Sequence, residues 1–340
     1  MGSCRQIAQQ LVAPGKGVLA ADESIATMSG RLEKAGVEAT AEHRRRYREL
    51  LATTPGLADG ASGIIFSDET LRQTVADGSP FAQAVRALGV LPGIKVDTGA
   101  KPCPGLPGET VTEGLDDVAA RLAAYAEIGA AFAKWRAVHV ITDALPSAGA
   151  LRSNANALAR YAAACQAAGI VPIVEPEVLM DGTHPIDRCA EVTAAAHAAV
   201  REELALLGVD LAGIVLKPNM VIEGRDHAGT TSPARVAEAT VEVLRAWPDE
   251  LAGVAFLSGG QPPERATANL EAMQHHATPW PLTFSFGRAL VDPALAAWHG
   301  DPALVEAGQA ALAERVSANA TAVRRSHTEF VAGTPTAVGV

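Results

Sequence analysis

Short apolar stretches recur eight times along the 340 residues of the chain, and several of them are continuously apolar rather than alternating. Continuous apolar runs of this length are typical of parallel strands that are buried on both faces. The pattern therefore predicts eight buried strands, at residues 17–22, 63–67, 93–97, 132–141, 170–177, 213–218, 253–258 and 282–286.

Helical patterns occupy most of the intervals between these strands. A Ser-Pro pair is expected to begin a helix at residues 79–80 and another at residues 232–233, because serine caps a helix and proline fits its first turn. Glycines are expected to end two helices, at Gly89 and, after an Ala-rich run over residues 187–207, at Gly208. One further helical face comprises Leu115, Val118, Leu122 and Ala126.

The alternation of strands and helices predicts an α/β protein, a single-domain (β/α)8 TIM barrel over residues 1–330. The alternative is an open doubly wound sheet, which usually carries a Gly-rich fingerprint after its first strand. Here the first strand ends in Ala-Asp-Glu-Ser at residues 21–24, so the barrel is favoured. The small residues at 331–340 are expected to form a flexible C-terminal tail.

Charge and cysteine content narrow the classes of function. The net charge of −10 argues against nucleic-acid binding, and no apolar run reaches the roughly 18 residues that a membrane span needs. The four cysteines match no Cys-x-x-Cys or zinc-site spacing, and no secretory signal precedes them, so a cytoplasmic protein with reduced thiols is expected. The basic run at residues 43–48 is expected to be a solvated helix face, balanced by Glu42 and Glu49.

Charged residues end most of the predicted strands, and a barrel enzyme carries its active site at this edge. Charges are rarely buried unless they are paired or functional, so their convergence on one rim indicates a functional site. The residues concerned are Asp22, Lys95, Asp97, Lys134, Arg136, Glu175, Glu177, Lys217 and Arg288.

Lysine is rare in this chain. Only six of the 28 basic residues are lysines, and Lys95, Lys134 and Lys217 lie within apolar strands. Arginine cannot replace a lysine that must lose its proton, so an amine nucleophile is the chemistry that requires lysine. Lys217 is the candidate to form an imine with a carbonyl, because apolar surroundings and a second ammonium favour a neutral amine. A buried salt bridge is the alternative.

The acidic residues leave two interpretations open. Glu175 and Glu177 point the same way if their strand is extended, and beside lysines they form ion pairs or perform acid–base chemistry. Asp22 is either a functional carboxylate or a helix N-cap.

The last two strands end in glycine-containing turns that are typical of a phosphate site. Ser258, Gly259 and Gly260 follow the seventh strand, and Gly287 and Arg288 follow the eighth. Barrels often bind phosphate with these two loops, through backbone amides and a guanidinium. The alternative is two ordinary turns and a surface arginine.

Seven segments, in this order, resemble those of the class I, Schiff-base-forming fructose-bisphosphate aldolases, and the resemblance covers residues 7–321. The segments are GKGVLAADES (15–24), GIKVD (93–97), FAKWR (132–136), PIVEPE (172–177), LKPNM (216–220), FLSGGQ (256–261) and TFSFGRAL (283–290). The resemblance implies reversible cleavage of fructose 1,6-bisphosphate to dihydroxyacetone phosphate and glyceraldehyde 3-phosphate, with no metal and no cofactor.

The resemblance also implies roles for individual residues. Lys217 matches the imine-forming lysine, and Lys134 matches the lysine that assists it. Glu175 matches the glutamate that moves protons during carbinolamine dehydration, and Asp22 matches the aspartate that takes the C4-hydroxyl proton. The implied substrate-binding positions are Ser258, Gly259, Gly287 and Arg288 for the C1 phosphate, Ser24, Thr27 and Lys95 for the other phosphate, and Arg31, Arg136 and Glu177 in support. Trp135 is interpreted as a packing residue.

Two departures from the family pattern affect these expectations. Ile25, Ala26 and Thr27 stand where the family usually has Thr-Gly-Ser, so one hydroxyl is lost. Animal members end in a tyrosine that helps to protonate the enamine, whereas the last tyrosine here is Tyr161. We therefore expect Glu175, a water or another rim group to deliver that proton.

The family often forms homotetramers, so a homo-oligomer is expected. The alternative substrates are sedoheptulose 1,7-bisphosphate and tagatose 1,6-bisphosphate, and the alternative outside catalysis is a scaffold.

Overall fold

The structure is a computed structural model that describes residues 3–332, with side chains described up to residue 324. Eight parallel strands form one sheet in chain order: β1 (Gly17–Ala21), β2 (Ala61–Phe66), β3 (Leu91–Lys95), β6 (Phe132–His139), β7 (Val171–Val178), β8 (Val215–Leu216), β9 (Val254–Phe256) and β10 (Leu282–Phe284). The amide of Ala20 donates to the carbonyl of Phe286 at 2.9 Å, which joins the two ends of the sheet. The predicted barrel is confirmed, and the doubly wound alternative is wrong.

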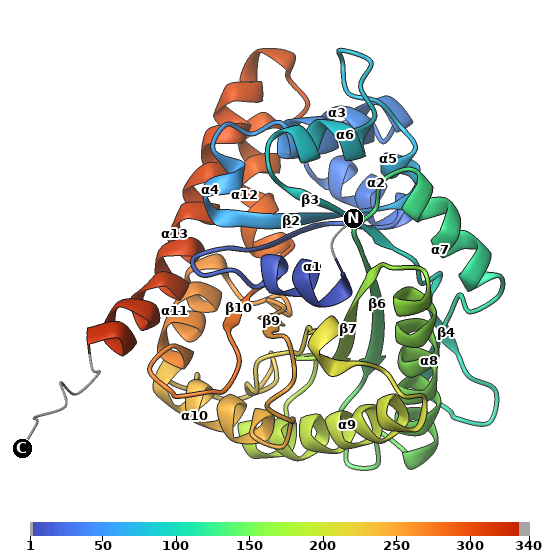
Figure 1. The fold of residues 1–340 in the computed structure, drawn as a ribbon. Coiled ribbons are helices and arrows are strands. Elements are labelled where there is room, and N and C mark those ends of the chain that lie inside the picture. Colours follow the sequence, from blue (N-terminus) through green and yellow to red (C-terminus); the bar gives the residue numbers. More distant parts are fainter. Residues whose placement is uncertain (1–2, 333–340) are drawn as a thin grey trace, which may run out of the picture.

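Helices surround the strands (Figure 1). They are α1 (Cys4–Leu11), α2 (Ile25–Lys34), α3 (Ala41–Ala52), α4 (Leu57–Gly60), α5 (Asp68–Leu71), α6 (Phe81–Ala87), α7 (Val118–Glu127), α8 (Ala148–Ala167), α9 (Ile186–Leu206), α10 (Pro233–Leu244), α11 (Pro263–Met273), α12 (Arg288–Trp298) and α13 (Val305–Ala332). Short 3-10 turns lie at Leu211–Gly213 and Pro302–Leu304, and β4 (Gly99–Pro102) pairs with β5 (Thr110–Glu113) as an antiparallel hairpin.

Helix α1 closes the N-terminal end of the barrel. Its buried residues Ile7, Ala8 and Leu11 pack in one cluster with inward-facing strand residues such as Ile65 and Phe132. In Figure 1 this helix lies across the strands at the centre of the molecule. A ligand therefore has access to the barrel from the opposite end, where the strands end.

Most of the predicted helix boundaries are confirmed. Ser232 caps α10 through the amide of Arg235, and Gly208 follows α9 with a φ of +64°. Gly89 has a φ of +82° and lies directly after the C-cap of α6. The predicted start of α6 is wrong by one residue, because Pro80 has an extended ψ of 141° and the helix begins at Phe81. In the predicted 115–126 face, Leu115 precedes α7, which begins at Val118.

The expectation that residues 43–48 form a solvated face is wrong for half of the arginines. Arg45 and Arg46 do pair with Glu42 near the surface. Arg44 and Arg48 are instead 9 % and 2 % exposed and lie on the face of α3 that carries Tyr47 and Leu51. Positions 44, 47, 48 and 51 have the spacing of a buried helical face, but an arginine at such a position reads as polar in the sequence.

Helix α13 packs along α12 and α11 and reaches Ala332, so the first two residues of the predicted tail at 331–340 are helical. Residues 333–340 of that predicted tail lie outside the described residues. Over the described part of the chain, every helix is too short or too polar to cross a membrane.

Candidate active site

A cavity of about 1140 Å³ opens at the C-terminal ends of the strands. It is lined by every residue for which the sequence predicted a catalytic or binding role: Asp22, Ser24, Thr27, Arg31, Lys95, Lys134, Arg136, Glu175, Glu177, Lys217, Ser258, Gly259, Gly287 and Arg288. These residues lie on or directly after most of the strands, along α2 from its N-cap to its last turn, and at the start of α12. The predicted convergence on one rim is confirmed.

Four buried charges lie together in this cavity. Lys134 projects from β6, Glu175 from β7, Lys217 follows β8 and Asp22 follows β1. Their exposed fractions are 3 %, 3 %, 3 % and 8 %, respectively. Burying an isolated charge is costly, so two ammonium groups and two carboxylates in one cluster make this burial tolerable.

Glu175 lies between the two lysines. Its Oε1 is 3.3 Å from Nζ of Lys217, and its Oε2 is 3.3 Å from Nζ of Lys134. Oε2 is buried and accepts no hydrogen bond from the described residues. A carboxyl with one oxygen facing each amine is placed to exchange protons with either of them.

Asp22 is an ionised carboxylate rather than a helix cap. Its Oδ2 lies 2.7 Å from Nζ of Lys134. Burial acts to raise its pKa, but the charges of Lys134 and Lys217 outweigh burial and lower the pKa of Asp22 to about 2. Burial acts against the charge of Lys134, yet Asp22 and Glu175 raise its pKa. The N-cap alternative for Asp22 is wrong, because Ser24 accepts the amide of Thr27 and caps α2.

Two further ion pairs lie along the wall of the cavity. Nε of Arg136 lies 2.5 Å from Glu177, and Nζ of Lys95 lies 2.6 Å from Asp97. Glu175 and Glu177 face the same side, as predicted, because β7 is extended and alternate residues share a face.

Two helix N-termini face the cavity from opposite sides of the junction between β10 and β1. Gly287 precedes α12, and Ser24 precedes α2. Gly259 and Gly260 have positive φ values of +60° and +88°, and a Cβ at Gly260 would lie 3.1 Å from Nη2 of Arg288. Free amides at a helix N-terminus favour anions, so each helix end offers a place for a phosphate.

The sequence assigned no catalytic or binding role to Asp97, which it placed only among the charges at the rim, and it did not mark Ser285 at all. Asp97 is 7 % exposed and accepts hydrogen bonds from the amides of Gly99 and Arg136. It does end an apolar strand, which is the signal that marks it. Ser285 is 1 % exposed, lines the same cavity, and its Oγ has no hydrogen-bond partner among the described residues. A serine in an apolar run carries no comparable signal.

Comparison with known proteins matches this geometry to one family. The family model for class I fructose-bisphosphate aldolase matches residues 3–336. The chain belongs to the class I fructose-bisphosphate aldolase family. It is 49 % identical over 333 residues to fructose-bisphosphate aldolase of Drosophila melanogaster, covering 97 % of this chain and 92 % of that protein.

A bacterial relative and a solved structure support the same family assignment. A protein of Xanthomonas campestris pv. campestris, described as a probable fructose-bisphosphate aldolase class 1, is 51 % identical over 298 residues, covering 87 % of this chain and 89 % of that protein. The solved structure of fructose-bisphosphate aldolase from Plasmodium falciparum superposes with a TM-score of 0.93 at 43 % identity, covering 94 % of each chain. The predicted family is confirmed.

Proposed function

We propose that this aldolase cleaves fructose 1,6-bisphosphate through an imine on Lys217. The observation that carries the proposal is the position of Glu175, 3.3 Å from both Lys217 and Lys134, in a cavity that the N-termini of α2 and α12 also face. A sugar with a phosphate at each end fits two anion sites, and binding both ends holds the reacting carbons in place.

The first stage is imine formation. Lys217 passes a proton to Glu175, 3.3 Å away, and the resulting neutral amine attacks the C2 carbonyl of the open-chain sugar; the carbinolamine so formed loses water. Glu175 donates the proton that lets hydroxide leave as water, and its contact with Lys217 places it for this transfer. The ammonium of Lys134 compensates the negative charge that Glu175 acquires.

The second stage is carbon–carbon cleavage. Asp22, ionised beside Lys134, takes the proton of the C4 hydroxyl. The C3–C4 bond breaks, its electron pair moves into the protonated imine to form an enamine, and glyceraldehyde 3-phosphate leaves.

Protonation of the enamine at C3 and hydrolysis of the imine complete the cycle. Hydrolysis consumes the water that was released earlier and frees dihydroxyacetone phosphate. We propose that Glu175 delivers the C3 proton, after Asp22 has returned the proton of the C4 hydroxyl to Glu175 by way of Lys134, which contacts both carboxylates. All three tyrosines of the chain lie outside the cavity lining, and Tyr161 is fully buried against Trp135.

Trapping the imine tests this function. Borohydride added with dihydroxyacetone phosphate should reduce a covalent adduct onto Lys217, located by peptide mass spectrometry. Lys217→Arg should remain folded and lose both the adduct and cleavage, because a guanidinium forms no imine. Lys101→Arg, at an exposed lysine of β4, is the matched control and should retain both. An adduct on another lysine would contradict the assignment.

Substrate preference and assembly stay predictions. Comparison of kcat/KM for fructose 1,6-, sedoheptulose 1,7- and tagatose 1,6-bisphosphate tests the first. Light scattering of the purified protein tests the expected homotetramer. A cytoplasmic location remains the expectation from the sequence.

A further inference from the structure

One buried arginine holds the backbone on both sides of Asp22. Arg48 of α3 is 2 % exposed, and its Nε donates to the carbonyl of Ala21 at 2.6 Å. Its Nη2 donates to the carboxylate of Glu23 at 2.8 Å and to the carbonyl of Glu23 at 3.4 Å. Ala21 and Glu23 are the residues directly before and after Asp22. The two flanks of the cleavage base therefore have a common anchor.

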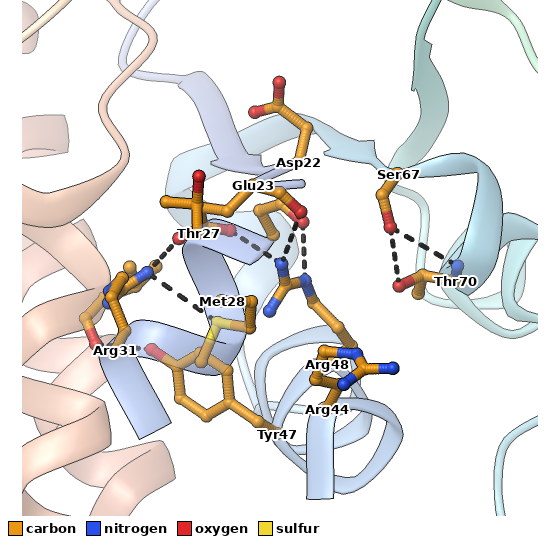
Figure 2. Close-up of polar contacts among 12 residues, drawn as sticks. Asp22, Glu23, Thr27, Met28, Arg31, Arg44, Tyr47, Arg48, Ser67 and Thr70 are labelled. Carbon is orange, nitrogen blue, oxygen red and sulfur yellow. Dashed lines mark hydrogen bonds and ion pairs between the residues drawn. The ribbon is translucent and has the colours of Figure 1, made fainter. Parts of the chain in front are cut away.

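Arg48 belongs to an ion-pair network with Glu23, Arg31 and Asp292, and these three line the edge of the cavity whereas Arg48 does not. Figure 2 shows the carboxylate of Glu23 directed toward Arg48, whereas that of Asp22 points away from the arginines. Successive residues of an extended segment face opposite sides, so holding Glu23 on one side directs Asp22 to the other. Glu23 is also paired with Arg31, which in turn lies 2.6 Å from Asp292 of α12.

The network pairs the charge of Arg48 but leaves part of its hydrogen-bonding capacity unused. Nη1 of Arg48 is buried and has no hydrogen-bond partner among the described residues. Glu23 provides the countercharge, and the guanidinium carbon lies 5.8 Å from the ring centroid of Tyr47. A buried ion pair is weak evidence for stability, because removing two charges from water often costs as much as their attraction returns. Its geometry points instead to a role in positioning.

We propose that Arg48 is a positioning residue that holds Asp22 where it can accept the C4-hydroxyl proton. Arg48 does not touch the cavity, and it acts through Ala21 and Glu23. This inference rests on the proposed function, because it needs Asp22 to be the base of carbon–carbon cleavage. Glu175 lies on β7 and Lys217 follows β8, across the barrel from β1, and neither pairs directly with Asp22 or Arg48, so we expect the imine-forming step to be less sensitive to Arg48 than carbon–carbon cleavage.

The test compares cleavage with imine formation in the full-length enzyme. Arg48→Met removes the charge and the hydrogen bonds, and Arg48→Lys keeps the charge but loses the fork that reaches both flanks. Arg44→Met is the matched control: Arg44 is a buried arginine of the same helix, but it pairs with Glu69 and makes no contact with the end of β1. Each protein is measured for thermal stability, kcat and KM, and for borohydride trapping with dihydroxyacetone phosphate.

We expect kcat for fructose 1,6-bisphosphate to fall about tenfold or more in both Arg48 variants, because a small displacement of a catalytic group is costly. We expect KM and the rate of trapping on Lys217 to change by less than about threefold, a small difference in barrier. Arg44→Met should lose stability but keep kcat. If Arg48→Met does not fold, Arg48→Lys carries the test and should show the same separation of kcat from trapping.

Three results would overturn the proposal: an unchanged kcat in folded Arg48 variants, a parallel loss of cleavage and trapping, or an equal loss of kcat in Arg44→Met. Failure of the proposed function is distinguishable, because the unmodified enzyme would then form no adduct on Lys217.

Discussion

Asp22 keeps its negative charge at low pH because two ammonium groups face it. Its pKa is about 2 in the folded protein, against an ordinary value of 3.8. Because the folded pKa is the lower one, the stabilisation is fully present above about pH 4 and is lost as the pH falls toward 2. The difference corresponds to about 2 kcal/mol of unfolding free energy.

Denaturant unfolding of the parent and of Asp22→Asn between pH 7 and pH 2 checks this contribution. The variant should be less stable at neutral pH, and the two stabilities should converge as the pH falls from 4 to 2. A difference that stays constant over this range would show that Asp22 gains nothing from its neighbours.

Arg288 is the exposed cation at the start of α12, and it is expected to bind the C1 phosphate. Arg288→Ala should weaken binding of dihydroxyacetone phosphate about tenfold or more, because a charge-assisted hydrogen bond is lost. The rate constant of cleavage in a single turnover at saturating substrate should fall by a smaller factor than the affinity. Titration calorimetry measures the affinity, with Arg245→Ala on the distant end of α10 as control. An unchanged affinity would show that Arg288 does not bind the phosphate.

At the scale of elements, β3 and β6 fit together because β3 has a glycine where they meet. A Cβ at Gly93 would lie 2.3 Å from the ring of Phe132, which fills the barrel interior. Gly93→Ala should therefore lower the unfolding free energy by roughly 1–3 kcal/mol through overpacking.

Gly30→Ala is the matched control for that substitution. Gly30 lies within α2, and a Cβ there would meet no atom within 4 Å. Alanine is the better helix former by roughly 0.5–1 kcal/mol, so this variant should gain stability. Guanidinium unfolding of both variants measures the change in unfolding free energy, which should be negative for Gly93→Ala and positive for Gly30→Ala. Equal effects would mean that the contact with Phe132 is not what excludes a side chain.

The elements could be predicted where a single local signal decides them. Continuous apolar runs marked the strands, and Ser232 and Gly208 marked helix ends, because caps act within one turn. The basic run on α3 was misread, because nothing local says that Glu23 and Glu69 of other elements would pair with Arg48 and Arg44.

The site was predictable in membership but not in pairing. Charges at strand ends must converge in a barrel, so the residues that line the cavity could be named from the sequence. Which carboxylate faces which lysine depends on the distances between strands, and these placed Asp22 rather than Glu177 against Lys134. Ser285 carries no charge and lies within the apolar run at residues 282–286, so no pattern singled it out.

At the scale of the whole molecule, the two ends of the barrel have different tasks. Apolar side chains and α1 fill the N-terminal end, and the charged cluster occupies the other. The four buried charges of the active site thus lie above a close-packed apolar layer, and this packing limits the ways in which their side chains can rearrange.

The junction between β1 and β10 has a dynamic consequence. A hydrogen bond from Ala20 to Phe286 and another from Thr283 to Lys16 hold it, with Ser24 beyond one edge and Arg288 beyond the other. A ligand with a phosphate at each end would contact both sides of this junction at once, and it would therefore reduce local opening between β1 and β10. Amide exchange at Ala20 should slow more with a non-cleavable hexitol 1,6-bisphosphate than with dihydroxyacetone phosphate at equal occupancy, followed by deuterium uptake. Equal protection by both ligands would mean that opening of the β1–β10 junction does not depend on a ligand that spans it. Stronger protection by the bisphosphate would mean that the bound substrate itself helps to hold the barrel closed while it reacts.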